Sequence, residues 1–176
     1  KYSMRISQRI LFRVRGIELP NIDIYTGRVL SIPNLSKEHL IPKKFFRNKK
    51  HANHPLNVVP CHKYINNQRS DYRFGDVYID LSSNTYDYDP IHIGVDDSIG
   101  IINHRHRVFY PSHYADKGLI ARNCLVVLDD HHYLYRYLDE IIEHPALFDI
   151  WRDLYPVVSK YERSQNRLLA KLKCVK

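Results

Sequence analysis

The sequence has little of what stabilises small secreted proteins or membrane proteins. It contains three cysteines, Cys61, Cys124 and Cys174, which can form at most one disulfide bond, so free thiols in a reducing compartment are the simpler expectation. No apolar run is long enough to span a bilayer, and therefore no membrane partner is predicted. There is no internal repeat and no linker-like composition, which for 176 residues predicts one domain, 1–176, with a substantial core.

Acidic residues are outnumbered by basic ones. The chain has 19 Asp and Glu against 27 Lys and Arg, giving a net charge of +8, which favours a polyanionic partner without requiring one. Residues 1–17 contain no acid, and three arginines recur every four residues from Arg5. This pattern predicts a basic N-terminal arm over residues 1–20. A mitochondrial presequence and a first strand from Ile10 to Val14 are the alternatives.

The segment 38–75 contains the pattern on which the functional prediction depends. A short apolar run headed by Glu38 and His39 predicts a strand, and the run from Asn57 to Pro60 predicts its partner. The polar segment from His62 to Asp71 shows no alternation and ends before a glycine, which predicts a short helix. Strand, loop, strand and helix in this order would bring the carboxylate, the imidazole and a helix amide together.

These residues resemble the bacterial endonuclease I family, which are nucleases of the ββα-metal (His-Me finger) class. The resemblance implies an α+β fold, with a ββα-metal core over 38–75, additional strands, and a C-terminal helical layer over 111–172. It covers roughly the last four-fifths of the chain, and three blocks in family order are a specific match. The blocks are Glu38-His39-x-x-Pro42 with Asn57-Val58-Val59-Pro60 and Ile65-Asn66-x-x-Arg69-Ser70-Asp71-x-x-Phe74-Gly75; Phe109-Tyr110-Pro111 with Lys117-Gly118-Leu119-Ile120-Ala121-Arg122; and, more weakly, Trp151, Pro156, Glu162 and Asn166.

The resemblance also implies roles for individual residues. Glu38 and Asn66 would bind one hard divalent ion, because two protein oxygens leave most of an octahedral site for waters and a phosphate oxygen, as Mg²⁺ prefers; Mn²⁺ and Ca²⁺ are the alternatives. His39 would be the general base, a task that suits an ordinary imidazole pKa near neutrality. Arg47, the one arginine in the loop between the two strands, would be the catalytic residue that stabilises the scissile phosphate.

The basic run from Lys43 to Lys50 predicts contacts with the phosphates of a nucleic acid. A solvated charged loop is the alternative, and its aromatic residues Phe45 and Phe46 are predicted to be core anchors. The predicted nucleic-acid-binding residues are Lys43, Lys44, Lys49, Lys50 and Arg69.

Histidines and a cysteine in the same region have spacing that is similar to zinc ligands. Neighbouring Cys and His side chains rarely face one metal, however, and the family that the chain resembles has no structural zinc here, so zinc is the less favoured interpretation. The residues concerned are His51, His54, Cys61 and His62.

Elsewhere the sequence predicts strands at Ile22–Tyr25 and Val77–Leu81, a turn-rich polar segment over 82–107, and helices broken at prolines. Arg122 either reaches the cleft or forms a structural ion pair, and Cys124 and Trp151 are predicted to lie in the core. The predicted helices are Lys117–Leu128, Tyr133–His144, Pro145–Leu154 and Val157–Leu172.

Taken together, the resemblance implies a metal-dependent, sequence-nonspecific endonuclease that cuts DNA, or RNA as an alternative, leaving 5′-phosphate and 3′-hydroxyl ends. An HNH-type toxin or homing nuclease would share the finger but not the block from Lys117 to Arg122. The family precedent is secreted or periplasmic, whereas the few cysteines and the arginine-rich start favour an intracellular or organellar protein. The sequence identifies no inhibitor or assembly partner.

Several departures from the family pattern favour a different class, a catalytically inactive nuclease-fold subunit that binds nucleic acid or scaffolds a nucleoprotein assembly. His54 and Leu56 stand where the family has Asp-x-His, Tyr110 replaces a Glu, and Gln165 replaces an Arg. The family's Gln-Gly-Asn near its end has no match. The intact Glu38, His39 and Asn66 oppose this alternative and favour the enzyme.

Overall fold

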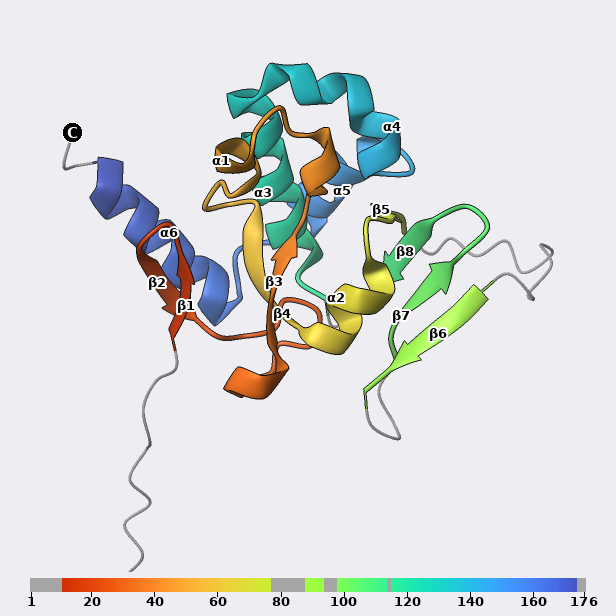
Figure 1. The fold of residues 1–176 in the computed structure, drawn as a ribbon, viewed down its shortest axis with the longest axis horizontal. Helices are drawn as coiled ribbons and strands as arrows, with labels where there is room; N and C mark the ends of the chain where they lie inside the picture. The colour runs from red at the N-terminus through yellow and green to blue at the C-terminus, as the bar shows by residue number, and fades with distance from the viewer. Residues whose placement is uncertain (1–10, 77–87, 94–97, 114, 174–176) are drawn as a thin grey trace, which may run out of the picture.

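The computed structural model describes residues 11–76, 88–93, 98–113 and 115–173. A β-hairpin crossed by a short helix forms the centre, with longer helices behind it, a four-stranded sheet on one side and a small hairpin on the other (Figure 1). Strands and helices are mixed along the chain without regular alternation, which is an α+β arrangement. No helix within these described residues is long and apolar enough to cross a membrane.

The N-terminal hairpin joins β1 (Leu11–Val14) to β2 (Ile17–Pro20) in an antiparallel pair. Its turn consists of Arg15 and Gly16, which have φ angles of 48° and 80°; the left-handed conformation is one that glycine adopts without steric cost. Residues 1–20 were predicted to be a basic arm, with a strand ending at Val14 as an alternative; the hairpin over the described residues 11–20 agrees with the alternative. Helix α6 (Lys160–Lys173) packs against β2.

The central unit consists of β3 (Leu35–His39), β4 (Val58–His62) and α2 (Lys63–Arg69). The strands pair antiparallel, and the helix follows β4 directly with His62 as its N-cap. The second strand and the helix are predicted correctly. The first strand was predicted to begin at Glu38, but it ends at His39. The apolar residues after it do not continue the strand pairing, because the Asn57 side chain binds both the N–H and the C=O of Ile41.

The loop between β3 and β4 folds over the helical layer. It contains the 3-10 turn η2 (Lys43–Phe45) and the single helical turn α1 (Lys49–Ala52), which Asn48 caps by accepting a bond from the His51 N–H. Phe45 and Phe46 are buried as predicted. The Phe45 ring stacks on Tyr137 at 5.0 Å between centroids, so apolar contacts hold the basic loop against the helices.

The four-stranded sheet has the order β5-β8-β7-β6 and is antiparallel except for the parallel pair of β5 and β8. The prediction of a turn-rich segment over 82–107 is wrong, because β6 and β7 lie in it. The edge strand β6 has exposed Asp89 and Pro90, so its sequence does not show the alternation of apolar and polar residues that predicts a strand. The strand predicted at Val77–Leu81 falls outside the described residues. The four strands are β5 (Arg73–Phe74), β6 (Tyr88–His92), β7 (Ser98–Asn103) and β8 (Val108–Pro111).

The described chain after β8 is helical, as predicted for residues 111–172, and α3 packs along α5 behind the hairpin (Figure 1). Trp151 and Cys124 are 0% and 1% exposed, which confirms both as core residues. Cys61 is also buried, and Cys61 and Cys124 are both free thiols. The helices are α3 (Lys117–Asp130), the 3-10 helix η4 (His132–Tyr137), α4 (Leu138–Ile141), α5 (Ala146–Leu154) and α6. A further 3-10 turn, η1 (Ile32–Asn34), lies directly before β3.

The strand predicted at Ile22–Tyr25 is wrong. This segment makes only an isolated bridge from Ile22 to Val29 and otherwise forms a turn. The Asp23 carboxylate organises the turn by accepting bonds from the Tyr25 N–H and the Thr26 hydroxyl. A side chain that bonds to its own backbone two residues on is typical of a turn and competes with a strand ladder.

Candidate active site at the end of strand β3

Helix α2 binds the end of β3 through two side chains three residues apart on one helix face. The Asn66 amide donates to Ser36 Oγ at 2.7 Å and to the Lys37 carbonyl at 3.1 Å. Arg69 pairs with the Glu38 carboxylate and donates to the carbonyls of the two following residues. Since Ser36 and Glu38 are two residues apart on a strand, they share a face. The carboxylate and the amide that the sequence predicted as metal ligands therefore lie on the same side of the hairpin.

The Glu38 carboxylate is enclosed. Its residue is 1% exposed, and its Oε1 accepts bonds from both Arg69 and the Tyr25 hydroxyl, the latter at 3.2 Å. Burial raises the pKa of Glu38, and the neighbouring guanidinium and hydroxyl oppose that rise.

Glu38 and Asn66 each have one side-chain oxygen of a kind that hard divalent ions accept as a ligand. Both bonds to Glu38 are made to Oε1, and Asn66 uses its NH₂ group for its two bonds. This leaves Glu38 Oε2 and Asn66 Oδ1, a carboxylate oxygen and an amide oxygen, which are ligands that Mg²⁺, Mn²⁺ and Ca²⁺ accept. The described residues contain no group of three or more His, Cys, Asp and Glu able to hold a metal, so an ion here would take its remaining ligands from water or substrate.

His39 is the last residue of β3 and follows Glu38 in the sequence. Its Nε2 is 3.1 Å from Asn53 Oδ1, a contact that holds the ring against the loop. Burial and the positive charge of Lys43 lower the pKa of His39, while hydrogen bonds to Asn53 and to the Lys37 backbone raise it; the net pKa is lowered. A lowered pKa keeps the imidazole neutral at pH 7, as a general base requires.

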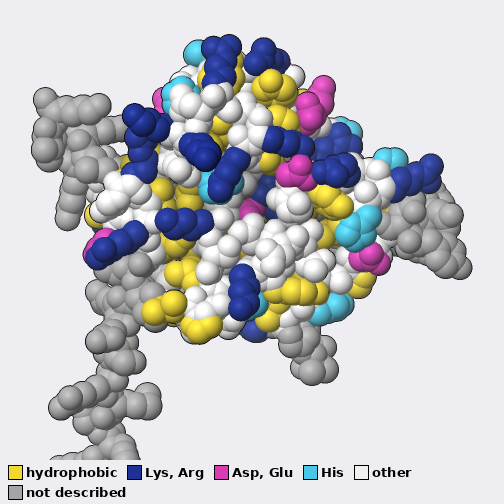
Figure 2. All heavy atoms as spheres, in the orientation of Figure 1, with side chains coloured by type: hydrophobic (Ala, Val, Ile, Leu, Met, Phe, Trp, Pro, Cys, Tyr) yellow, Lys and Arg dark blue, Asp and Glu magenta, His cyan; other side chains and the backbone are white. Residues whose placement is uncertain are grey.

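The basic loop lies on the surface next to His39. The five predicted cations of this loop are exposed, and Figure 2 shows Lys and Arg side chains gathered on the upper half of the face, above the end of β3. Lys44 pairs with Asp71 at 2.7 Å. The Arg47 guanidinium lies over the Tyr133 ring, 4.4 Å from its centroid. Aromatic contact fixes that arginine on the helical layer while leaving its charge accessible.

The expectation that Arg69 contacts nucleic acid is not met. The residue is 0% exposed, and its guanidinium lies 4.1 Å from the centroid of the Phe74 ring. Helical spacing explains this burial, because Arg69 follows the fully buried Ile65 by four residues and so shares its face. Tyr25 and Asn53, which hold Glu38 and His39, were not predicted; a turn tyrosine and a loop asparagine carry no sequence signal of that role.

The zinc interpretation is also not supported. Cys61 is buried in β4 and its thiol bonds to the His62 carbonyl, whereas His51 and His54 lie in the loop that covers the helices. The His51 ring instead stacks on His131 at 4.4 Å, and His54 Nε2 is 3.1 Å from Asp130. These histidines attach the basic loop to the end of α3, which is a packing role that sequence spacing does not reveal.

Arg122 forms a structural ion pair and does not reach the site. Its Nε and NH2 bond the two oxygens of Glu162 at 2.6 and 2.8 Å, and its third nitrogen donates to the Tyr155 and Arg152 carbonyls. The pair joins α3 to α6. The second and third blocks of the family pattern therefore meet in the core of the helical layer.

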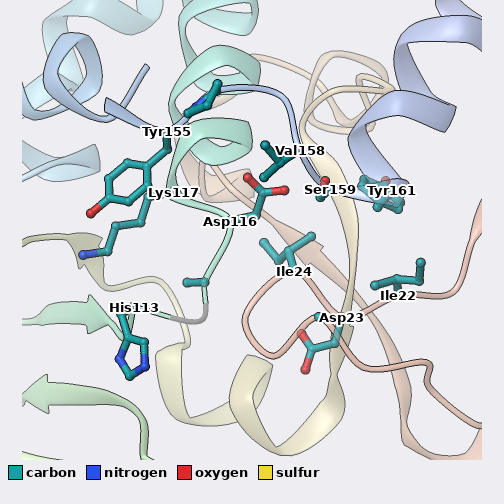
Figure 3. Close-up of a pocket in the computed structure, with 13 residues that line it drawn as sticks. Ile22, Asp23, Ile24, His113, Asp116, Lys117, Tyr155, Val158, Ser159 and Tyr161 are labelled. Carbon is teal, nitrogen blue, oxygen red and sulfur yellow. The ribbon is translucent and has the colours of Figure 1, made fainter. Parts of the chain in front are cut away.

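A cavity of about 260 Å³ lies elsewhere, between the turn that contains Asp23, the start of α3 and the segment before α6 (Figure 3). None of the predicted site residues lines it. Its carboxylates have structural partners, since Asp116 caps α3 and Asp23 holds its own turn. The described cavity is therefore separate from the candidate active site.

Fold and site together define an α+β protein with a helix-crossed hairpin, a neutral histidine, a buried carboxylate and a basic surface. A comparison with known protein families matches residues 26–174 to Endonuclease I. The chain belongs to the endonuclease I family, which confirms the resemblance seen in the sequence and implies a nuclease that acts on nucleic acid. The family is generally metal-dependent. A search of curated proteins found no match.

Proposed function

We propose that this chain is a divalent-metal-dependent endonuclease that hydrolyses phosphodiester bonds of DNA without sequence specificity, with RNA as an alternative substrate. The observation that supports this most is the binding of α2 to β3 through Asn66 and Arg69. In this proposal that binding holds the Glu38 carboxylate, the Asn66 amide and the backbone that carries His39 in fixed positions on one hairpin. Family membership supplies the reaction class, and these three groups supply the chemistry.

In this proposal the imidazole of His39 accepts the proton of the attacking water, and Asn53 holds the ring in place. Glu38 Oε2 and Asn66 Oδ1 hold the divalent ion, which when bound supplies positive charge for the phosphate and the leaving oxygen. Arg47 adds a second positive charge at the phosphate, and the loop lysines bind flanking phosphates. Phosphate contacts carry no base information, which accounts for the absence of sequence specificity.

Nicking of supercoiled plasmid tests the proposal. The wild-type protein is expected to nick plasmid with Mg²⁺ or Mn²⁺, to stop when a chelator is added, and to leave 5′-phosphate ends. Asn66→Ala removes a predicted ligand oxygen and should abolish nicking. Asn67→Ala is the matched control, because Asn67 is the next residue of α2 and is exposed. Equal activity of the two variants would remove Asn66 from the site.

A second candidate is a nuclease-fold subunit that binds nucleic acid without cutting it. The enclosure of Glu38, at 1% exposure and paired with Arg69, favours this candidate, because an ion must reach a carboxylate that already has a cationic partner. Binding of duplex DNA with no nicking under Mg²⁺, Mn²⁺ or Ca²⁺ would establish it. Such a result would leave the basic loop as the functional surface.

A further inference from the structure

One buried guanidinium holds three consecutive residues at the end of β3. Arg69 pairs with the Glu38 carboxylate, NH1 donates to the His39 carbonyl at 2.9 Å, and NH2 donates to the Leu40 carbonyl at 2.8 Å. With the two bonds of Asn66, helix α2 thus bonds to every residue from Ser36 to Leu40. The predicted metal ligand and the predicted base are both within the segment that this helix fixes.

The guanidinium cannot easily leave this position. Arg69 and the Phe74 ring against its guanidinium are both 0% exposed, and Phe74 in turn contacts Trp151 with ring centroids 6.3 Å apart. The Glu38 carboxylate and the two carbonyls surround one planar group, which suits the several N–H donors of a guanidinium. The lysine ammonium is a single charged centre on a flexible side chain and does not match this geometry. The arrangement is therefore specific to arginine at this position.

Stability alone does not account for a buried ion pair here. Replacing such a pair by apolar residues of similar volume often leaves the folding stability unchanged or raises it. The best-attested use of a buried ion pair is to fix how two structural elements align with one another. The Tyr25 hydroxyl adds to the effect, because it donates to the same Oε1 atom at 3.2 Å and is itself 0% exposed. Two donors on Oε1 restrain the rotation of this carboxylate.

We infer that Arg69, assisted by Tyr25, is the positioning residue of this site, which orients Glu38 for a divalent ion and fixes the backbone that carries His39. The inference rests on the proposed function. Arg69 touches neither ion nor nucleic acid in this role, since it is enclosed on all sides. Partners that orient a metal ligand typically change metal affinity or activity by about 10- to 100-fold when replaced.

The test compares Arg69→Lys with the matched control Arg163→Lys, which makes the same change at an exposed position of α6. Thermal unfolding first establishes that each variant folds. Mn²⁺ affinity is then measured from the EPR signal of the free ion, and kcat and KM are measured for plasmid nicking. We expect Arg69→Lys to lose about 10- to 100-fold in Mn²⁺ affinity and in kcat with KM for DNA unchanged, and the control to behave as wild type.

A third readout does not depend on catalysis. The Leu40 N–H bonds to the Asn57 carbonyl at 2.9 Å and the Ile41 N–H to the Asn57 side chain at 2.8 Å. If Arg69 fixes this segment, these two amides should exchange hydrogen faster in Arg69→Lys, while those of β7 do not change. Should Arg69→Lys fail to fold, Tyr25→Phe, which removes a single hydroxyl, is expected to weaken Mn²⁺ binding in the same direction.

The outcomes separate the inference from the proposed function. Unchanged Mn²⁺ affinity, kcat and amide exchange in Arg69→Lys would overturn the inference, and so would a raised KM with unchanged kcat, because that result assigns Arg69 to DNA binding. A wild-type protein that neither binds Mn²⁺ nor nicks DNA would refute the proposed function and, with it, the role toward the ion. The amide exchange would then still decide whether Arg69 fixes the backbone that carries His39.

Discussion

The ion pair between Arg122 and Glu162 allows a quantitative prediction. Glu162 is 1% exposed and both of its carboxylate oxygens bond to the guanidinium. Arg122→Ala leaves that carboxylate buried without its charged partner, which typically costs about 3–5 kcal/mol. For a chain of this size each kcal/mol lowers the melting temperature by about 2–4 °C, so the expected decrease is about 6–20 °C.

Thermal unfolding by circular dichroism measures this decrease. Arg152→Ala is the control, because Arg152 pairs with Asp149 and Asp153 on the surface, where such pairs contribute little. Combining Arg122→Ala with Glu162→Ala should cost less than the sum of the two single changes, because the double variant buries no unpaired charge. A decrease for Arg122→Ala no larger than that of Arg152→Ala would refute the reasoning.

Three further predictions concern the basic loop and the base. Changing Lys49 and Lys50 to Gln should flatten the slope of log K against log salt by up to about two units, since each phosphate contact contributes about 0.9 on duplex DNA; an unchanged slope would mean that these lysines are only solvated. Arg47→Ala should lower turnover more than affinity, which single-turnover nicking and a binding titration separate. Because the pKa of His39 is lowered from 6.5 and the base acts deprotonated, kcat/KM should rise with pH through a midpoint below 6.5. Lys43→Gln removes a charge that lowers this pKa and should move the midpoint to higher pH, and a midpoint that stays in place would contradict the assignment.

The sequence predicted best those elements whose signals are local. The strand from Val58, the helix α2 and the long helices of the C-terminal half follow from short-range periodicity, caps and prolines. The prediction failed where hydrogen bonds from one side chain take the place of backbone pairing between strands. Asn57 bonds the backbone of Ile41 in place of a strand partner, and Asp23 makes a turn of a segment whose composition favours a strand.

The site residues were predicted from the family pattern, but their environment was not. Arg69 is predicted to bind nucleic acid, although its position four residues after Ile65 indicates the buried helix face. The contacts of Tyr25 and Asn53 with the site depend on tertiary packing and have no local signal. The roles of Glu38, Asn66, His39 and the loop cations stay predictions.

The central claim is that His39 performs the chemistry. Single-turnover nicking and DNA affinity are measured together for wild type, His39→Ala and the control His92→Ala, which removes an exposed histidine of β6. A general base contributes about 10²- to 10⁴-fold to the rate and little to ground-state binding. The account therefore predicts a rate loss of about that size in His39→Ala with unchanged affinity. Wild-type nicking rates in His39→Ala would contradict the account.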